Sequence, residues 1–387
     1  MLLSGLLILG ALAVGLGTGK GLVQTAALFV QGLLDPATLQ LMGVITLIEM
    51  ITIFLQLTGS LQRILHALRK VFADSRVLIA LVPTLLGLFP VPGGAMLSAP
   101  MVGVYGDEIG IKANRKSAIN LFFRHIWDQV FPFKPHLILA AAVLNIPLFT
   151  LIGWHLPVTL VSALVGYEYL VGRYPKPQAV PDSPEGAAGG RPLWIEVMPL
   201  LLPLILGLGF RIDFFFATAA GLLFGFATQS VSRSMFGTIL KKGVRLQLLL
   251  LIAAVMIFKV ALESSGLLKI LAQALPGYGI PLSVLALALP LIISTATGIE
   301  LVAVGMVYPM VVGMVPEGAP ALPYILIMMT ANAIGQTYSP VHICMVVGNE
   351  YFGASLRKVV QMSIVPQAVR LLATFLFAWL LYLYLSR

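Results

Sequence analysis

Residues 81–101 read LVPTLLGLFPVPGGAMLSAPM, an apolar stretch that proline and glycine interrupt at its centre. A second stretch of this kind, LALPLIISTATGIELVAVGMVYPM, covers residues 287–310 and also ends in Pro-Met. The apolar regions around them, Val77–Val104 and Ile280–Val312, are each shorter than the roughly 40 residues that two membrane crossings would need. Both ends of each region must therefore return to the same side of a membrane. This predicts two re-entrant helical hairpins, at 77–104 and 280–312.

The composition places the chain in a membrane. Apolar residues make up 59% of the 387 residues, charged residues make up 10%, and the mean hydropathy is +0.99. An ordinary soluble domain carries about 25% charged residues. The composition excludes a soluble globular enzyme, a disordered chain and a nucleic-acid-binding protein, and it makes membrane lipids the expected surroundings. The predicted fold class is an all-α polytopic membrane protein.

Seven other apolar stretches have the character of ordinary membrane spans. They are Leu2–Gly17, Leu39–Leu57, Leu156–Val171, Leu193–Phe210, Phe214–Gln229, Leu246–Leu262 and Ile364–Tyr384. The polar stretch at 173–192 is rich in proline, glycine and charge, which is typical of a linker.

The chain on the two sides of this linker repeats one order of elements. Each side has a span, an amphipathic segment, a hairpin, an apolar helix broken by proline, and a closing span. The broken helices, predicted at 118–144 and 324–347, contain INLFFRHIWDQVFPFKPHLIL (119–139) and IMMTANAIGQTYSPVHICMVV (327–347). The predicted organisation is an N-terminal span with an external amphipathic segment at 1–37, repeat 1 at 38–172, the linker at 173–192, two connecting spans at 193–245, and repeat 2 at 246–387.

Basic residues predict the orientation of the two repeats, because lysine and arginine are enriched in cytoplasmic loops. The amphipathic segment and the post-hairpin loop of repeat 1 hold Arg63, Arg69, Lys70, Arg76, Lys112, Arg115 and Lys116, whereas the equivalent segments of repeat 2 hold Lys269. The repeats are therefore predicted to be inverted, in the inner membrane of a prokaryote, with the N-terminus and the linker in the cytoplasm. Irregular backbone from both sides then meets near the midplane, where secondary transporters bind their substrates.

The predicted substrate site combines the hairpin tips with the broken helices. A guanidinium at Arg124 can hold a carboxylate through two hydrogen bonds; the alternative is that this side chain snorkels to the cytoplasmic edge. The neutral polar groups either bind substrate or merely satisfy the broken backbone. The candidate substrate-binding residues are Pro92, Gly93, Gly94, Ser98, Asn120, Arg124, His125, Thr295, Thr297, Gly298, Asn332 and Ser339.

Ionisable groups at membrane depth are costly and usually face a cavity or a partner. The predicted ion-coupling residues are Glu49, Asp128, Glu300, Gln336 and His342. Two interpretations stay open for the carboxylates, a proton or cation site and a structural ion pair. Arg124 and Asp128 are four residues apart and would share one helical face. Lys259 on a neighbouring span is the alternative partner of Glu300.

Catalytic and cofactor motifs are missing from the sequence. It contains no H-E-x-x-H zinc motif, no G-x-S-x-G elbow, no P-loop and no dinucleotide fingerprint. The single cysteine, Cys344, excludes a disulfide framework and a thiolate metal cluster. No catalytic residue, no metal centre and no cofactor is therefore expected, apart from Na⁺ that freed backbone carbonyls at the breaks can coordinate.

The leading prediction is a secondary active transporter of a small organic anion, of carboxylate type, coupled to H⁺ or Na⁺. A cation/proton antiporter using Glu49, Asp128 and Glu300 without an organic substrate is the alternative. An intramembrane enzyme using Asp128 and His125 is a third hypothesis, and the repeated architecture argues against it.

The stretches PVPGGAMLSAPMV (90–102), INLFFRHIWDQVFPFKP (119–135) and TATGIE (295–300) resemble domain-of-unknown-function family 401, a prokaryotic membrane family of the ion transporter superfamily. That superfamily also holds gluconate permeases, citrate and dicarboxylate carriers and sodium/proton antiporters. The resemblance covers nearly the whole chain. It implies an inverted-repeat transporter with two hairpins, often a homodimer, that moves a transport domain past a scaffold in elevator fashion.

Overall fold

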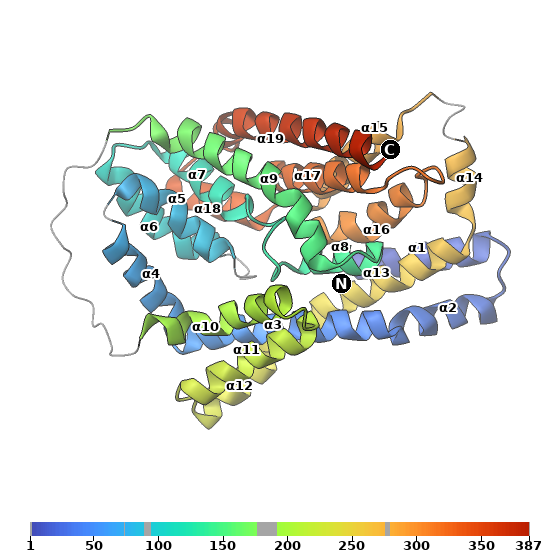
Figure 1. Ribbon diagram of the computed structural model, residues 1–387, viewed down its shortest axis with the longest axis horizontal. Helices are drawn as coiled ribbons and strands as arrows, with labels where there is room; N and C mark the ends of the chain where they lie inside the picture. Colours follow the sequence, from blue (N-terminus) through green and yellow to red (C-terminus); the bar gives the residue numbers. More distant parts are fainter. Residues whose placement is uncertain (1, 73, 89–93, 176–191, 275–278, 387) are drawn as a thin grey trace.

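The computed structural model describes residues 2–72, 74–88, 94–175, 192–274 and 279–386 (Figure 1). Every regular element within these ranges is a helix, which confirms the predicted all-α class. In chain order they are α1 Leu2–Gly17, α2 Leu22–Leu34, α3 Pro36–Leu57, α4 Ser60–Val71, α5 Ser75–Gly87, α6 Ala95–Glu108, α7 Ala113–His125, α8 Pro135–Leu144, α9 Leu148–Tyr167, η1 Glu168–Gly172, α10 Leu193–Leu204, η2 Ile205–Gly209, α11 Phe214–Thr228, α12 Arg233–Gly243, α13 Leu246–Ser264, α14 Leu267–Ala274, α15 Leu282–Thr297, α16 Glu300–Val312, α17 Leu322–Tyr338, α18 Ile343–Phe352 and α19 Leu356–Leu385.

Within the described ranges, four helical segments are long and apolar enough to cross a membrane, so the chain is a multi-pass membrane protein. They are Pro36–Leu57, Leu148–Gly172, Arg233–Ser264 and Leu356–Leu385, and each contains one of the predicted spans. The predicted spans at 2–17, 193–210 and 214–229 form helices whose lengths fall short of the roughly 20 residues that a full crossing needs. α10 contains Pro199 and Pro203, which remove two backbone donors, and it continues into the π-turn η2.

Two pairs of packed helices occupy the predicted hairpin regions. α5 packs against α6, and α15 packs against α16. The second pair turns at Gly298, whose φ of +69° lies in the left-handed region that glycine adopts without steric cost. The centre of the first pair, residues 89–93, lies outside the described residues, and the predicted tip residues Pro92 and Gly93 lie there with it.

Both helices predicted to be broken are interrupted in the structure. The first leaves helical geometry after His125 and resumes at Pro135, where a missing N–H costs nothing in the first turn of α8. The second stops at Tyr338 and resumes at Ile343, with Pro340 in the gap. We call residues 126–134 the first break and residues 339–342 the second break.

The two halves of the chain contact each other reciprocally. α8, which follows the first break, packs on α16, and α18, which follows the second break, packs on α6 (Figure 1). The helices that precede each half pack on the other half. α1 and α2 pack on α13, and α11 and α12 pack on α3. This exchange brings both breaks to the junction between the two helix pairs.

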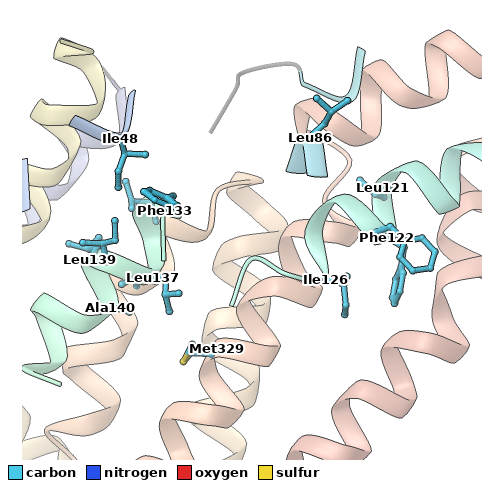
Figure 2. Packing of buried hydrophobic residues seen from close by; sticks show 14 of the residues in the cluster. Ile48, Leu86, Leu121, Phe122, Ile126, Phe133, Leu137, Leu139, Ala140 and Met329 are labelled. Atoms are coloured by element: carbon cyan, nitrogen blue, oxygen red, sulfur yellow. The ribbon is translucent and has the colours of Figure 1, made fainter. Parts of the chain in front are cut away.

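Buried apolar side chains hold the first break on both sides. Phe122 and Ile126 anchor the end of α7, while Phe133 and Leu137 anchor the start of α8, and all four are almost fully buried (Figure 2). Because lipid is as apolar as these side chains, they stabilise the fold mainly through close packing. The polar residues between them are thereby held in one position.

Candidate functional site

The side chain of Asp128 is the centre of the first break. Its Oδ2 lies 2.7 Å from Nδ1 of His125, and its Oδ1 lies 2.6 Å from Nζ of Lys134. Lys134 also donates to the carbonyl oxygen of Gly87 at 2.5 Å. Asp128 is only 2% exposed, so this carboxylate lies inside the protein, paired with the ammonium of Lys134 and the imidazole of His125.

The expectation that Arg124 and Asp128 share one helical face is wrong. α7 ends at His125, and the N–H of Asp128 donates to the carbonyl oxygen of His125 in the turn that follows. Helical spacing therefore no longer relates positions 124 and 128. Among the described residues, the ionic partners of Asp128 are His125 and Lys134.

Arg124 is buried in protein and is 3% exposed, which argues against snorkelling to a membrane edge. Within the described part of the chain, its Nη1 has no hydrogen-bond partner. Its Nη2 lies so close to Gly94 that a Cβ placed there would approach it to 2.1 Å. Gly94 is the N-cap of α6, so the guanidinium lies beside the first turn of that helix.

His342 connects the second break to the first break and to the turn of the second helix pair. Its Nδ1 lies 3.1 Å from the carbonyl oxygen of Gly298, and its Nε2 lies 3.1 Å from Nε2 of His125. The hydroxyl of Ser339 would lie 3.2 Å from a Cβ placed on Gly298. Predicted residues from three separate segments are thus brought together here.

Glu300 is contacted from the first break, from the start of α8 and from α17. Its Oε2 accepts a hydrogen bond from Gln129 at 2.7 Å and lies 3.3 Å from Nε2 of His136. On the other side, Gln336 accepts from its backbone N–H at 3.1 Å, and Asn332 donates to its backbone carbonyl oxygen at 3.2 Å.

The alternative partner considered for Glu300, Lys259, is directed elsewhere. Its Nζ donates to the carbonyl oxygen of Ala142 at 3.4 Å and lies 3.9 Å from Glu263. α13 carries Lys259 past α8, so this ammonium group faces a helix end instead of the carboxylate. Among the described residues, Oε1 of Glu300 has no hydrogen-bond partner.

Glu49, Ser98, Thr295 and Thr297 also have hydrogen-bond or ion-pair partners within the protein. Glu49 forms a salt bridge of 2.8 Å with Arg245, which is the structural pairing that the sequence left open for this carboxylate. Ser98 donates to Asn120 at 2.6 Å where α6 packs on α7. Thr295 and Thr297 donate to carbonyl oxygens of their own helix, one turn back.

Some residues of the site were not predicted to be functional. Gln129 and Lys134 belong to the first break, His136 lies in the first turn of α8, and Cys344 lies in the first turn of α18 beside His125 and His342. Arg370 of α19 is 1% exposed and interacts electrostatically with Glu300 and Asp128. The sequence offers one signal for Arg370, namely a charged residue inside the apolar stretch 364–384, which is typical of a functional position.

A cavity of about 950 Å³ lies elsewhere, where α3 and α8 face the segment that joins η2 to α11. Its lining includes Asn145, Arg211 and Asp213. None of the predicted site residues lines this cavity, so it is separate from the junction of the breaks.

A family model described as "Protein of unknown function (DUF401)" matches residues 5–385. The chain belongs to this family. The match confirms the family resemblance seen in the sequence. A search of curated protein sequences finds no match. The fold is similar to the crystal structure of the YdaH transporter of Alcanivorax borkumensis, with a TM-score of 0.67 and 14% sequence identity over 97% of this chain and 98% of that chain.

Proposed function

We propose that the chain is a secondary active transporter of a small organic anion and that Arg124 binds the anion. One observation carries this proposal, namely a buried guanidinium beside the N-terminus of α6 whose Nη1 has no hydrogen-bond partner among the described residues. A buried charge without a partner is costly. A carboxylate supplies that partner in a two-pronged geometry, and the first N–H groups of a helix favour an anion as well.

The architecture supports a transporter in preference to an enzyme. The fold is similar to that of a protein named as a transporter, and the two helix pairs, the two breaks and the reciprocal contacts follow one repeated order. We interpret the halves as inverted repeats and the helix pairs as re-entrant hairpins, as in the ion transporter superfamily. In this interpretation the junction of the breaks is the substrate site, and one rigid part moves past the other in elevator fashion.

Glu300 is the group that we propose couples transport to H⁺ or Na⁺. It is 2% exposed, it is contacted from the first break and from α17, and its Oε1 has no hydrogen-bond partner among the described residues. The same carboxylate would support cation/proton antiport without an organic substrate, which is the second candidate function.

Uptake into vesicles reconstituted with the purified protein tests the proposal. A panel of labelled mono-, di- and tricarboxylates is offered with an imposed H⁺ or Na⁺ gradient. We expect gradient-dependent uptake of at least one acid, a loss of about 10- to 100-fold in Arg124→Gln because a charge-assisted hydrogen bond is removed, and partial activity in Arg124→Lys. Arg357→Gln, at an exposed position in the first turn of α19, is the matched control and retains full uptake.

Two results would count against this function. Wild-type vesicles that move none of the acids but change internal pH when salt alone is added would establish the antiporter instead. Full uptake in Arg124→Gln would remove Arg124 from the substrate site. Thermal unfolding of each variant in detergent shows whether a lost activity reflects a lost fold.

A further inference from the structure

Three side chains that can each donate an electron pair to a metal meet where the two breaks touch. His125 comes from the end of α7, His342 is the N-cap of α18, and Cys344 lies in the first turn of α18. One ligand atom from each residue lies within 4.8 Å of the others. The proposed transport function uses His125 and His342 only as polar groups and assigns no role to Cys344.

The hydrogen bonds of the two imidazole rings determine which nitrogen carries the proton. Nδ1 of His125 faces the carboxylate of Asp128, and Nδ1 of His342 faces the carbonyl oxygen of Gly298. Both partners are acceptors, since Asp128 is ionised in its pairing with Lys134. Each Nδ1 must therefore be a donor, and in a neutral ring that leaves Nε2 with a free electron pair.

The two Nε2 atoms face each other at 3.1 Å, which places two electron pairs side by side. Two acceptors cannot form a hydrogen bond with each other, so a cation has to lie between them. A shared proton or a metal ion meets this requirement. The third donor, the sulfur of Cys344, has no function in a shared proton but is the preferred soft ligand of a metal such as zinc.

The distance between the two histidine nitrogens agrees with a tetrahedral metal site. Bond lengths of about 2.0–2.1 Å to nitrogen and about 2.3 Å to sulfur place two nitrogen ligands about 3.3 Å apart and a nitrogen and a sulfur about 3.6 Å apart. The observed 3.1 Å between the nitrogens is close to this, whereas the sulfur of Cys344, which lies within 4.8 Å of them, has to move closer to bind the same ion.

The groups behind the two histidines also fit a metal site. A histidine that binds a metal almost always donates its other N–H to a carboxylate or a backbone carbonyl. His125 does the first through Asp128, and His342 does the second through Gly298. The helix N-terminus at Cys344 favours the thiolate form that a metal requires.

We propose that His125, His342 and Cys344 bind one d-block divalent cation of the zinc type. Three protein ligands leave the fourth position of the tetrahedron open. Binding joins the first break to the second and fixes the end of α7 against the start of α18. The proposal goes beyond the transport function and does not depend on it, because metal binding is measured without transport.

Protection of the cysteine from alkylation tests the site directly, because Cys344 is the single cysteine of the chain. The purified full chain is treated with chelator, and the rate of its reaction with a maleimide is measured alone, with Zn²⁺ and with Mg²⁺. We expect micromolar Zn²⁺ to slow the reaction at least tenfold, Mg²⁺ to leave it unchanged because it prefers oxygen ligands, and chelator to restore it. In His342→Gln the Zn²⁺ protection is lost, whereas in His66→Gln, on the amphipathic helix α4, it is retained.

Co²⁺ gives a second measurement that reports the ligands. One equivalent is expected to produce the visible bands of tetrahedral Co²⁺ together with a thiolate-to-cobalt charge-transfer band, and Cys344→Ser is expected to remove the charge-transfer band. If Zn²⁺ leaves the alkylation rate unchanged, the histidines share a proton and the metal site is overturned. A charge-transfer band that persists in a folded His342→Gln variant would overturn it as well.

Discussion

The first and second breaks occupy equivalent places in the repeated order of helices, yet their chemistry differs. The first break and the end of α7 carry ionisable groups, including Arg124, Asp128 and Lys134. The second break and the end of α17 carry neutral amides and hydroxyls, such as Gln336 and Ser339. The same order of helices therefore carries different side-chain chemistry in the two halves. The first half concentrates charge at the junction, and the second half supplies neutral groups that hold the backbone around Glu300.

This difference has an energetic consequence. Removing one partner of a buried ion pair leaves an uncompensated charge, whereas removing one neutral hydrogen bond costs much less. The first break is therefore expected to be more sensitive to substitution than the second. The following substitutions test that ranking.

The largest effect is expected for Asp128→Asn. The substitution removes the negative charge that faces Lys134 and His125, and the single oxygen of the new amide can replace only one of the two carboxylate oxygens that they contact. We expect the free energy of unfolding to fall by about 3–5 kcal/mol. Unfolding of the purified protein in detergent measures this, and Asp107→Asn is the control because Asp107 pairs with Lys116 at an exposed position with 78% of its side chain accessible. Equal losses in the two variants would contradict the ranking.

The next largest effect is expected where a glycine allows two helices to approach closely. The two halves place this glycine on different helices. In the first half the glycine is on the helix pair, where a Cβ on Gly87 would lie 2.2 Å from the backbone oxygen of Arg124. In the second half it is on the broken helix, where a Cβ on Gly335 would lie 2.6 Å from the backbone oxygen of Leu291.

Alanine at Gly87 or Gly335 is expected to force the helices apart and lower the free energy of unfolding by about 1–3 kcal/mol. Gly153→Ala in α9 is the matched control, because nothing lies within 4 Å of a Cβ at that position. There we expect no loss or a slight gain, since alanine favours helix. A Gly335→Ala variant as stable as the control would show that the two halves are not packed in comparable ways.

The sequence predicts the helix breaks and turns of this molecule better than its side-chain contacts. Prolines beside apolar helices indicate both breaks, and the glycine in TATGIE indicates the turn at Gly298, because these residues act on their own backbone. The pairing of Asp128 with Lys134 was not predicted, because it depends on α7 ending at His125.

The contact between His125 and His342 was also beyond prediction, since it joins residues 217 positions apart. Such a contact depends on how the halves pack, which local spacing does not encode. Arg370 shows the same limit, because an arginine in a closing span carries no sign of which carboxylates it will approach.

A smaller effect is expected from a substitution at the end of α17, where the side chains are neutral. Gln336→Ala removes the acceptor of the N–H of Glu300 and should lower the free energy of unfolding by about 1 kcal/mol. Gln62→Ala, at an exposed position on α4, is the control and should have no effect. Because the Glu300 side chain keeps Gln129 and His136, we expect Gln336→Ala to retain transport. A loss as large as that of Asp128→Asn would mean that the second break is as critical as the first.

The smallest effect is expected for Glu49→Gln, which separates a structural ion pair from a coupling site. Arg245, the partner of Glu49, has 39% of its side chain exposed, so it can turn toward water when the carboxylate is removed. A glutamine can still accept the hydrogen bond from Nη1, and the expected loss of stability is about 1 kcal/mol or less. Transport should keep its dependence on the driving ion, whereas Glu300→Gln should lose that dependence while the protein stays folded. If Glu49→Gln uncouples transport and Glu300→Gln does not, the coupling site lies beside α3 and outside the junction of the two breaks.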